Sequence, residues 1–494
     1  MDPIARAVTV RRGLAGFCAV ALIAGLAWWI DDWIIVPALG VLWAGWRTLP
    51  RSDGIPVLAS AFTFQWAQVA SGALYTGLTG RTLPDANLAD YQPMLLIGLG
   101  CLVCLVVGLR LGIIAGERLG WWPPRGGRLP ASLARLVALY GVSVAVAGFV
   151  PKVAWALPGF TQGILALGFG RFVLLALVLG RLTVPRVQWR WIGLFLLVEV
   201  GLGFTGFFAE FREPLVLTAI VLLGVFERHR LQHWLVLGVI LVALVSSSVL
   251  WIGIRTTYRQ DFADEQFAES RLARAERAAS LSGAWFQGTL DDVLGDVDQL
   301  VDRVWAIHYP ALAVSRVPAV VPHEGGAILA RALWHVVTPR LLLTDKPVLE
   351  QDTEMVRRYS GIWFPEWHRS GTNIAFGYAA ESYVDFGVPL MFLPVFVYAV
   401  IMGLAYQWLM AAFRHRELAT AVAVVMFWLA LYLFERSWVK TLGFSLTLMV
   451  YLGGGALLVD RWLLPRAMRA PTRLRPVPPR TRSSLAARQS GRPR

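Results

Sequence analysis

PRLLLTDKPVLEQDTEMVRRYSGIWFPEWHRSGTNIAFGYAAESYVDFG, residues 339–387, is the stretch around which the chain is organised. Its residues are polar, charged and aromatic, whereas nearly everything around it is apolar. The stretch closes a long hydrophilic segment and runs without a break into a hydrophobic one. We therefore expect the chemistry of the protein in or near it.

The composition is that of a polytopic membrane protein. The chain has 494 residues, of which 56% are hydrophobic and 16% charged, and its mean hydropathy is +0.57. Soluble proteins rarely combine these values. The net charge is +14, and in a membrane protein excess arginine marks cytoplasmic loops rather than nucleic-acid binding. No nucleic-acid partner is predicted. The predicted partner is the lipid bilayer.

The fold class predicted is an all-α polytopic membrane protein. A membrane-spanning helix needs roughly 20 apolar residues, and about twelve segments come close to that length. These segments are 13–30, 33–47, 56–79, 93–115, 131–150, 158–181, 190–208, 214–227, 234–254, 387–411, 418–434 and 441–459.

The linkers between these segments alternate in charge. Every second linker and both termini are rich in arginine, which places them in the cytoplasm of a bacterial inner membrane. The organisation predicted is nine spans in residues 1–254, a large periplasmic loop in 255–386, three spans in 387–463 and a basic, disordered cytoplasmic tail in 464–494.

The external loop carries a predicted amphipathic helix. Apolar residues recur every three or four positions from Leu290 to Val304, as on one face of a helix that lies on the membrane domain or the membrane surface. Its aspartates are expected to form a solvated face. Neither zinc-binding nor calcium-loop spacing occurs, so no metal and no other cofactor is predicted.

Two groups of arginines lie at external ends of spans. Arg212 precedes Pro214, which suits the first turn of a helix, so a phosphate or pyrophosphate would suit Arg212; the alternative is an anchoring pair with a neighbouring glutamate. Arg255 and Arg259 share a helix face and could hold a diphosphate together; the alternative is that they snorkel at the helix end.

The third group lies in the opening stretch. Prolines brace a basic site that contains Arg340 and Lys346. Flat aromatic faces there suit sugar rings as well as protein packing. The predicted sugar-binding residues are Tyr359, Trp363, Trp367, Tyr383 and Asp385.

Two residues are predicted as catalytic bases. Glu381 precedes the next span, where its carboxylate could activate an acceptor hydroxyl; the alternative is that it balances a buried arginine. His368 is the second candidate. No phosphate-binding glycine loop and no GxSxG motif occurs, so the sequence offers no apparatus for ATP or serine hydrolysis.

In its spans and in these residues the chain resembles the Wzy-like polymerases of bacterial O-antigen and exopolysaccharide repeat units. The resemblance rests on the spans, the large late external loop and three short patterns. These are Arg212-Glu213-Pro214, Pro339-Arg340 followed by Asp345-Lys346-Pro347, and Glu381-Ser382-Tyr383-Val384-Asp385-Phe386-Gly387. The family commonly has asparagine where this chain has Asp385.

The resemblance implies a membrane glycosyltransferase that needs no cofactor. It would transfer a glycan from undecaprenyl diphosphate to an incoming lipid-linked repeat unit, with a chain-length regulator as a candidate partner. The implied diphosphate-binding residues are Arg212, Arg255, Arg259, Arg340 and Lys346. Two alternatives stay open, namely an O-antigen ligase or other lipid-linked glycosyltransferase, and a polysaccharide or lipid flippase.

Overall fold

The structure is a computed structural model of the whole chain. It describes residues 25, 33–81, 83, 90–124, 127–157, 159–184, 186–204, 211–261, 271–338, 352–362, 374 and 376–464. Within these residues the protein is helical, and one isolated β-bridge between Ser52 and Ile55 takes the place of any strand. The all-α prediction is confirmed.

The helices follow the apolar segments of the sequence. The first half contains α2 (Ile35–Thr48), α3 (Val57–Thr79), α4 (Gln92–Arg118), α5 (Leu133–Ala147), α6 (Val150–Ala156), α7 (Thr161–Gly168), α8 (Gly170–Thr183), α9 (Trp189–Phe204), α10 (Arg212–Gly224) and α11 (Leu231–Asp261). The second half contains α12 (Arg271–Trp285), α13 (Leu290–Val304), α14 (His308–Arg316), α15 (Ala327–Val337), α16 (Asp352–Ser360), α18 (Tyr378–Phe386), α19 (Phe392–Ala412), α20 (Arg416–Leu431), α21 (Trp438–Thr447), the π-helical η1 (Leu448–Gly453), α22 (Gly454–Leu458) and the π-helical η2 (Val459–Leu463).

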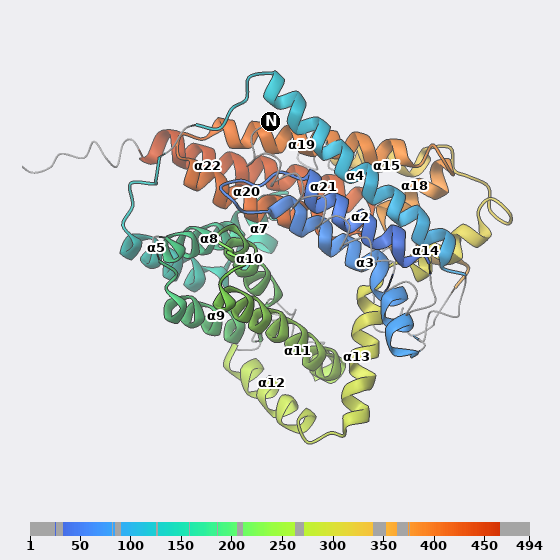
Figure 1. Cartoon of the computed structure of the whole chain (residues 1–494), viewed down its shortest axis with the longest axis horizontal. Helices are drawn as coiled ribbons and strands as arrows, with labels where there is room; N and C mark the ends of the chain where they lie inside the picture. Colours follow the sequence, from blue (N-terminus) through green and yellow to red (C-terminus); the bar gives the residue numbers. More distant parts are fainter. Residues whose placement is uncertain are drawn as a thin grey trace, which may run out of the picture.

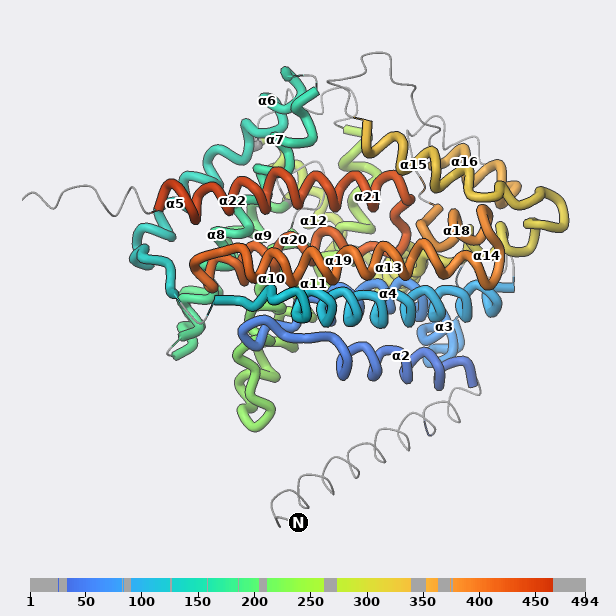
Figure 2. The backbone as a smooth tube through the Cα atoms, turned by 90° about the horizontal axis from the view of Figure 1, so that it is seen from above, coloured from blue at the N-terminus to red at the C-terminus, as the bar shows by residue number. Residues whose placement is uncertain are grey.

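The closest helix pair is α4 with α19, which lie side by side in both views (Figures 1 and 2). Glycines make this approach possible. A Cβ added at Gly108 would lie 2.6 Å from the Cβ of Ala399, and one added at Gly112 would lie 2.8 Å from the backbone nitrogen of Leu404. Small residues every fourth position let two helix backbones approach within a membrane. The order of these contacts shows that the two helices run in the same direction.

Several helices are able to cross a membrane, although twelve spans are not supported. Among the described residues, five helical segments are long and apolar enough, or six if the bent α5–α6 pair is one span. The five are Gln92–Arg118, Thr161–Thr183, Leu231–Asp261, Phe392–Ala412 and Trp438–Leu463. Predicted spans at α2, α9, α10 and α20 form helices of 13 to 16 residues. Segment 13–30 lies almost wholly outside the described residues.

Two predicted spans, α3 and α20, are not among these five segments. Both have residues that pack in the protein interior. Every residue of α20 from Leu418 to Leu431 is buried, so this helix fills the centre of the bundle and its neighbours shield it. Helix α3 carries polar groups toward it. The Gln68 Oε1 accepts the backbone N–H of Phe434 at 2.6 Å, and the Gln65 side-chain amide donates to the Leu431 carbonyl. These amides lower the hydropathy of α3 and are paired inside the fold.

Helix α13 confirms the predicted amphipathic helix. It begins at a capping box formed by Thr289 and Asp292, the expected start signal of a helix. The prediction that its aspartates are all solvated is wrong. Asp298 accepts a hydrogen bond from Tyr75 at 2.6 Å and pairs with Arg81, and Asp296 accepts from Trp285 at 2.6 Å. These contacts fix α13 against α3 and α12.

Several segments that the charge pattern assigns to the same side of the membrane lie at the same end of the long helices. Figure 2 shows the long helices extending between two ends, with α14, α16 and α18 at one end and α5 at the other. The first end holds segments predicted to be external; we call it the α18 end. The second holds three of the predicted cytoplasmic linkers, which contact one another through Arg181–Glu417 and Arg416–Asp53; we call it the α5 end.

Candidate active site

An arginine cluster gathers at the α18 end from three helices and one linker. Arg212 begins α10, Arg255 and Arg259 lie in the last turns of α11, and Arg303 lies in the last turn of α13. Arg303 lies close enough to repel both Arg255 and Arg259, and Arg259 also feels the charge of Arg212. The three predicted diphosphate-binding arginines of the described chain are therefore neighbours, although 47 positions separate the first from the last.

The linker between α20 and α21 completes the cluster. Glu435 pairs with Arg303 through both carboxylate oxygens, at 2.8 and 3.3 Å. This charge, together with the hydrogen bond, raises the pKa of Arg303 above its ordinary value. Next to it, the Arg436 guanidinium lies 5.5 Å from the ring centre of Tyr432, an attractive cation–π distance. Tyr432 feels the charges of both Arg212 and Arg436.

The cluster carries a net positive charge. Among the described residues it holds five guanidinium groups and three carboxylates. The guanidinium groups are those of Arg212, Arg255, Arg259, Arg303 and Arg436, and the carboxylates are those of Glu213, Asp302 and Glu435. Like charges gathered in a partly buried place raise the free energy of the empty site. A polyanion with several oxygens would relieve that repulsion and accept guanidinium hydrogen bonds.

Glu381 lies near this cluster, in α18. Its side chain is 2% exposed, and its Oε2 accepts the backbone N–H of Trp438 at 2.7 Å, at the start of α21. Burial raises the pKa of Glu381 to about 8, and the nearby charges of Asp352 and Asp385 act in the same direction. The alternative prediction is that Glu381 balances a buried arginine. The hydrogen-bond partner of its carboxylate is instead a backbone N–H at the start of a helix.

An ion pair between a lysine and an aspartate lies near Glu381. The Lys440 ammonium lies 2.5 Å from the buried carboxylate of Asp352, and both groups act electrostatically on Glu381. Lys440 follows Trp438 by two residues, in α21, while Asp352 begins α16. The side chain of Lys440 is 47% exposed, so this pair reaches from the buried carboxyl group to the surface.

Residues 434–438 connect the two charged groups. The backbone N–H of Tyr378, at the start of α18, donates to the carbonyl of Arg436 at 2.8 Å. Glu435 contacts the arginine cluster, and Trp438 contacts Glu381. Cationic groups and a titratable carboxyl therefore flank one five-residue segment.

The described residues predicted to bind sugar are engaged in the fold. Tyr359 is buried, stacks on Phe376 and donates to Glu324 at 2.8 Å. Tyr383 donates to the Val317 carbonyl at 3.0 Å. Asp385 accepts the backbone N–H groups of Ile328 and Leu329, at 3.0 and 2.8 Å. Asp385 thus caps the start of α15, although burial still raises its pKa.

Five predicted site residues lie outside the described residues. They are Arg340, Lys346, Trp363, Trp367 and His368. Their segments flank α16, whose first residue Asp352 belongs to the group around Glu381. No group of three or more potential metal ligands occurs in the described part of the chain.

Sequence analysis missed Arg303, Glu435, Arg436 and Lys440. The available signal was weak. Arg303 is the cation in the last turn of a helix otherwise rich in aspartate, and the other three residues lie within or beside a linker of six residues, 435–440. An arginine in a short linker that is predicted to be external runs against the positive-inside pattern.

The fold and the site define an all-helical protein with membrane-crossing helices and a cationic site at one end. Residues 134–433 match the family described as a domain of unknown function, DUF8712, and since this range covers more than half of the chain, the protein belongs to that family. The match includes four of the five clustered arginines and Glu381. Comparison with curated proteins and with solved structures gave no match.

Proposed function

We propose that the protein is a membrane glycosyltransferase that uses a polyprenyl-diphosphate-linked glycan as donor. Specifically, it would polymerise undecaprenyl-diphosphate-linked repeat units on the external face of the bacterial inner membrane, as the resemblance to Wzy-like polymerases implies. About twelve spans, cytoplasmic termini and an external loop at residues 255–386 belong to the same proposal. The arginine cluster is the observation that carries it.

The cluster has the chemistry of a leaving-group site. When a glycan leaves undecaprenyl diphosphate, the bond between its anomeric carbon and the diphosphate oxygen breaks, and the electron pair stays on the diphosphate. Guanidinium groups held in place before the reaction stabilise that developing charge without reorganisation. Arg212, Arg255 and Arg259 would hold the diphosphate, while Arg303 is oriented by Glu435 and supports them.

The acceptor must lose a proton as its oxygen bonds to the anomeric carbon. Glu381 is the described candidate for accepting that proton. Its raised pKa makes it a better base once deprotonated and reduces the deprotonated fraction at neutral pH. Because the carboxyl is buried, an acceptor would have to reach it from the protein surface. His368 is the second candidate base.

A complementation experiment tests the proposal. A strain that lacks the gene would receive wild-type protein, Arg259→Ala, Arg212→Ala or, as control, Arg277→Ala. Arg277 pairs with Asp261 at the surface, at 2.7 Å, and is not one of the five clustered arginines; such a pair contributes about 1 kcal/mol or less. Removing one donor from a charge-stabilising site costs roughly a hundredfold in rate.

Surface glycan and lipid-linked intermediates would then be separated by gel electrophoresis. Loss of long polymer in the deletion strain, with exported single repeat units, supports the polymerase. The two cluster variants should reproduce this loss at normal membrane abundance, whereas Arg277→Ala should restore polymer. Full-length polymer in both cluster variants would sink the diphosphate site. Long polymer left on its lipid carrier would indicate a ligase. Repeat units trapped on the cytoplasmic face of the membrane would indicate a flippase.

A further inference from the structure

A cavity lies at the α5 end of the helices, opposite the arginine cluster. Its volume is about 360 Å³, within the range of small-molecule sites. Residues from the loop before α3, the loop before α5, the ends of α8 and α10 and the start of α20 line it. These segments are far apart in the sequence, so the cavity is a product of the fold.

The interior of this cavity is apolar. Its walls carry the side chains of Leu177, Val221 and Val424 together with small residues. Gly180 is one of these, and a Cβ added there would meet no atom within 4 Å. The glycine therefore leaves open space that a larger side chain would occupy. An apolar space of this kind favours a hydrocarbon over water.

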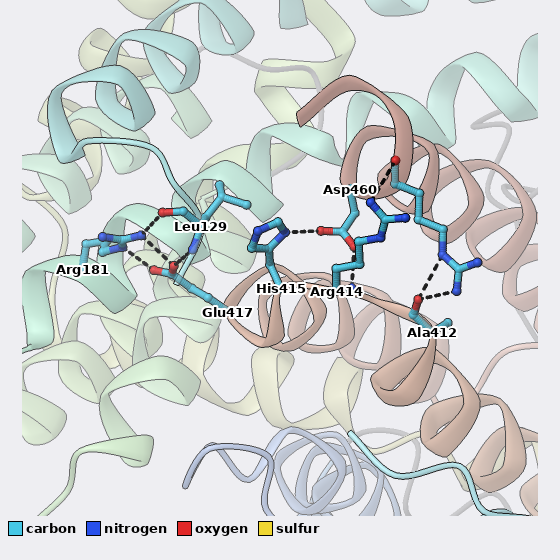
Figure 3. Close-up of polar contacts among 8 residues, drawn as sticks. Leu129, Arg181, Ala412, Arg414, His415, Glu417 and Asp460 are labelled. Atoms are coloured by element: carbon cyan, nitrogen blue, oxygen red, sulfur yellow. Dashed lines mark hydrogen bonds and ion pairs between the residues drawn. The ribbon is translucent and has the colours of Figure 1, made fainter. Parts of the chain in front are cut away.

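The rim of the cavity is cationic and held in place. The Arg181 guanidinium donates to the Glu417 carboxylate and, at 2.7 Å, to the Leu129 carbonyl, as Figure 3 shows. Arg416 pairs with Asp53 at 2.5 Å. The exposed Arg128 adds a third guanidinium, so three cations face two carboxylates among the lining residues. Each fixed guanidinium has more donors than one carboxylate engages.

We propose that this cavity binds an anionic phospholipid, with an acyl chain in the apolar interior and the phosphate against the arginine rim. The combination of charge and apolar space matches that amphiphile better than a free anion or a neutral lipid. The cavity also lies at helix ends, which the proposed topology puts at the depth where lipid phosphates meet water. This inference goes beyond the proposed function, because the site lies at the opposite end from the arginine cluster.

Thermal unfolding of the purified full-length protein in neutral detergent tests the proposal. The additives are phosphatidylglycerol, phosphatidylcholine with the same acyl chains, and soluble glycerol 3-phosphate. Ligands that bind only the folded state raise its melting temperature. Phosphatidylglycerol should raise the melting temperature by several degrees, whereas the other two should leave it nearly unchanged.

Matched variants separate the two halves of the site. Gly180→Leu fills the interior, and Arg128→Gln removes an exposed rim charge with little risk to folding; each should lose at least half of the shift. The controls are Gly141→Leu, where an added Cβ also meets nothing within 4 Å, and Arg47→Gln at an exposed arginine of α2; both should keep it.

Three results would overturn the lipid site. Equal shifts with phosphatidylcholine would make the effect a general lipid effect. A full shift with glycerol 3-phosphate alone would make the site a phosphate site without a chain. An undiminished shift in Arg128→Gln would remove the rim from the explanation, even if Gly180→Leu failed to fold.

Discussion

At the scale of single residues, the buried carboxyl of Glu381 sets a pH dependence of stability. Burial raises its pKa to about 8, whereas an unfolded glutamate titrates near ~4.3. Between these values the folded state binds more protons, so the free energy of unfolding falls as pH rises. We expect a higher melting temperature near pH 5.5 than near pH 8.5.

Glu381→Gln should flatten this pH dependence. The amide oxygen can still accept the Trp438 N–H, but the side chain no longer titrates. Between pH 5.5 and pH 8.5, the fall in the free energy of unfolding should be smaller in Glu381→Gln than in the wild-type protein by a few kcal/mol. Glu276→Gln, at an exposed glutamate of α12, should leave the wild-type slope unchanged. The same slope in Glu381→Gln as in wild type would show that another group is responsible.

The sequence predicts individual charges better than their partners. Arg212, Arg255 and Arg259 stand out because arginines at external helix ends depart from the charge pattern of the membrane. Arg303 and Arg436 join them through tertiary packing, which no spacing rule reveals. The same reason explains Asp385, whose partners are N–H groups of a helix that begins 58 positions earlier.

At the scale of elements, the contact between α4 and α19 depends on glycine. Gly112→Leu would push a side chain into the backbone of α19, where nothing flexible can yield. Overpacking of a tight interface costs about 1–3 kcal/mol, and more where backbones touch. We expect Gly112→Leu to lower the melting temperature by many degrees or to abolish accumulation in the membrane.

A matched substitution separates packing from hydrophobicity. Gly201→Leu adds the same side chain to α9, where an added Cβ meets no atom within 4 Å. It should accumulate like wild type in quantitative immunoblots of membranes. If Gly112→Leu were equally abundant and equally stable, the close approach of α4 and α19 would be wrong.

Helix boundaries follow from the sequence more readily than the number of spans. The apolar period of residues 290–304 gives the bounds of α13 because only a helix repeats at that spacing. The role of α20 needs the fold, because a helix buried by protein and a helix surrounded by lipid are both apolar. Its 16 residues are enough for an interior helix and short for a span.

At the scale of the whole molecule, two ends of opposite predicted location carry different charged sites. The α18 end holds the arginine cluster and Glu381, and the α5 end holds the cavity with the cationic rim. The parallel direction of α4 and α19 agrees with this division. The arginine counts predict which linkers share a side of the membrane, because translocation cost acts on loop charge.

Thiol labelling decides which end faces outward. Gln287, between α12 and α13, and His229, between α10 and α11, are both exposed, and each would be replaced by cysteine in turn. An impermeant maleimide should label Gln287→Cys in cells whose outer membrane is permeabilised, and His229→Cys only after lysis. The wild-type protein measures the background from its own cysteines, of which Cys101 is buried.

The reverse pattern would put the arginine cluster in the cytoplasm, where nucleotide-linked sugars are available. The proposal of an external transferase driven by a lipid diphosphate would then fall, while the helix packing would stand.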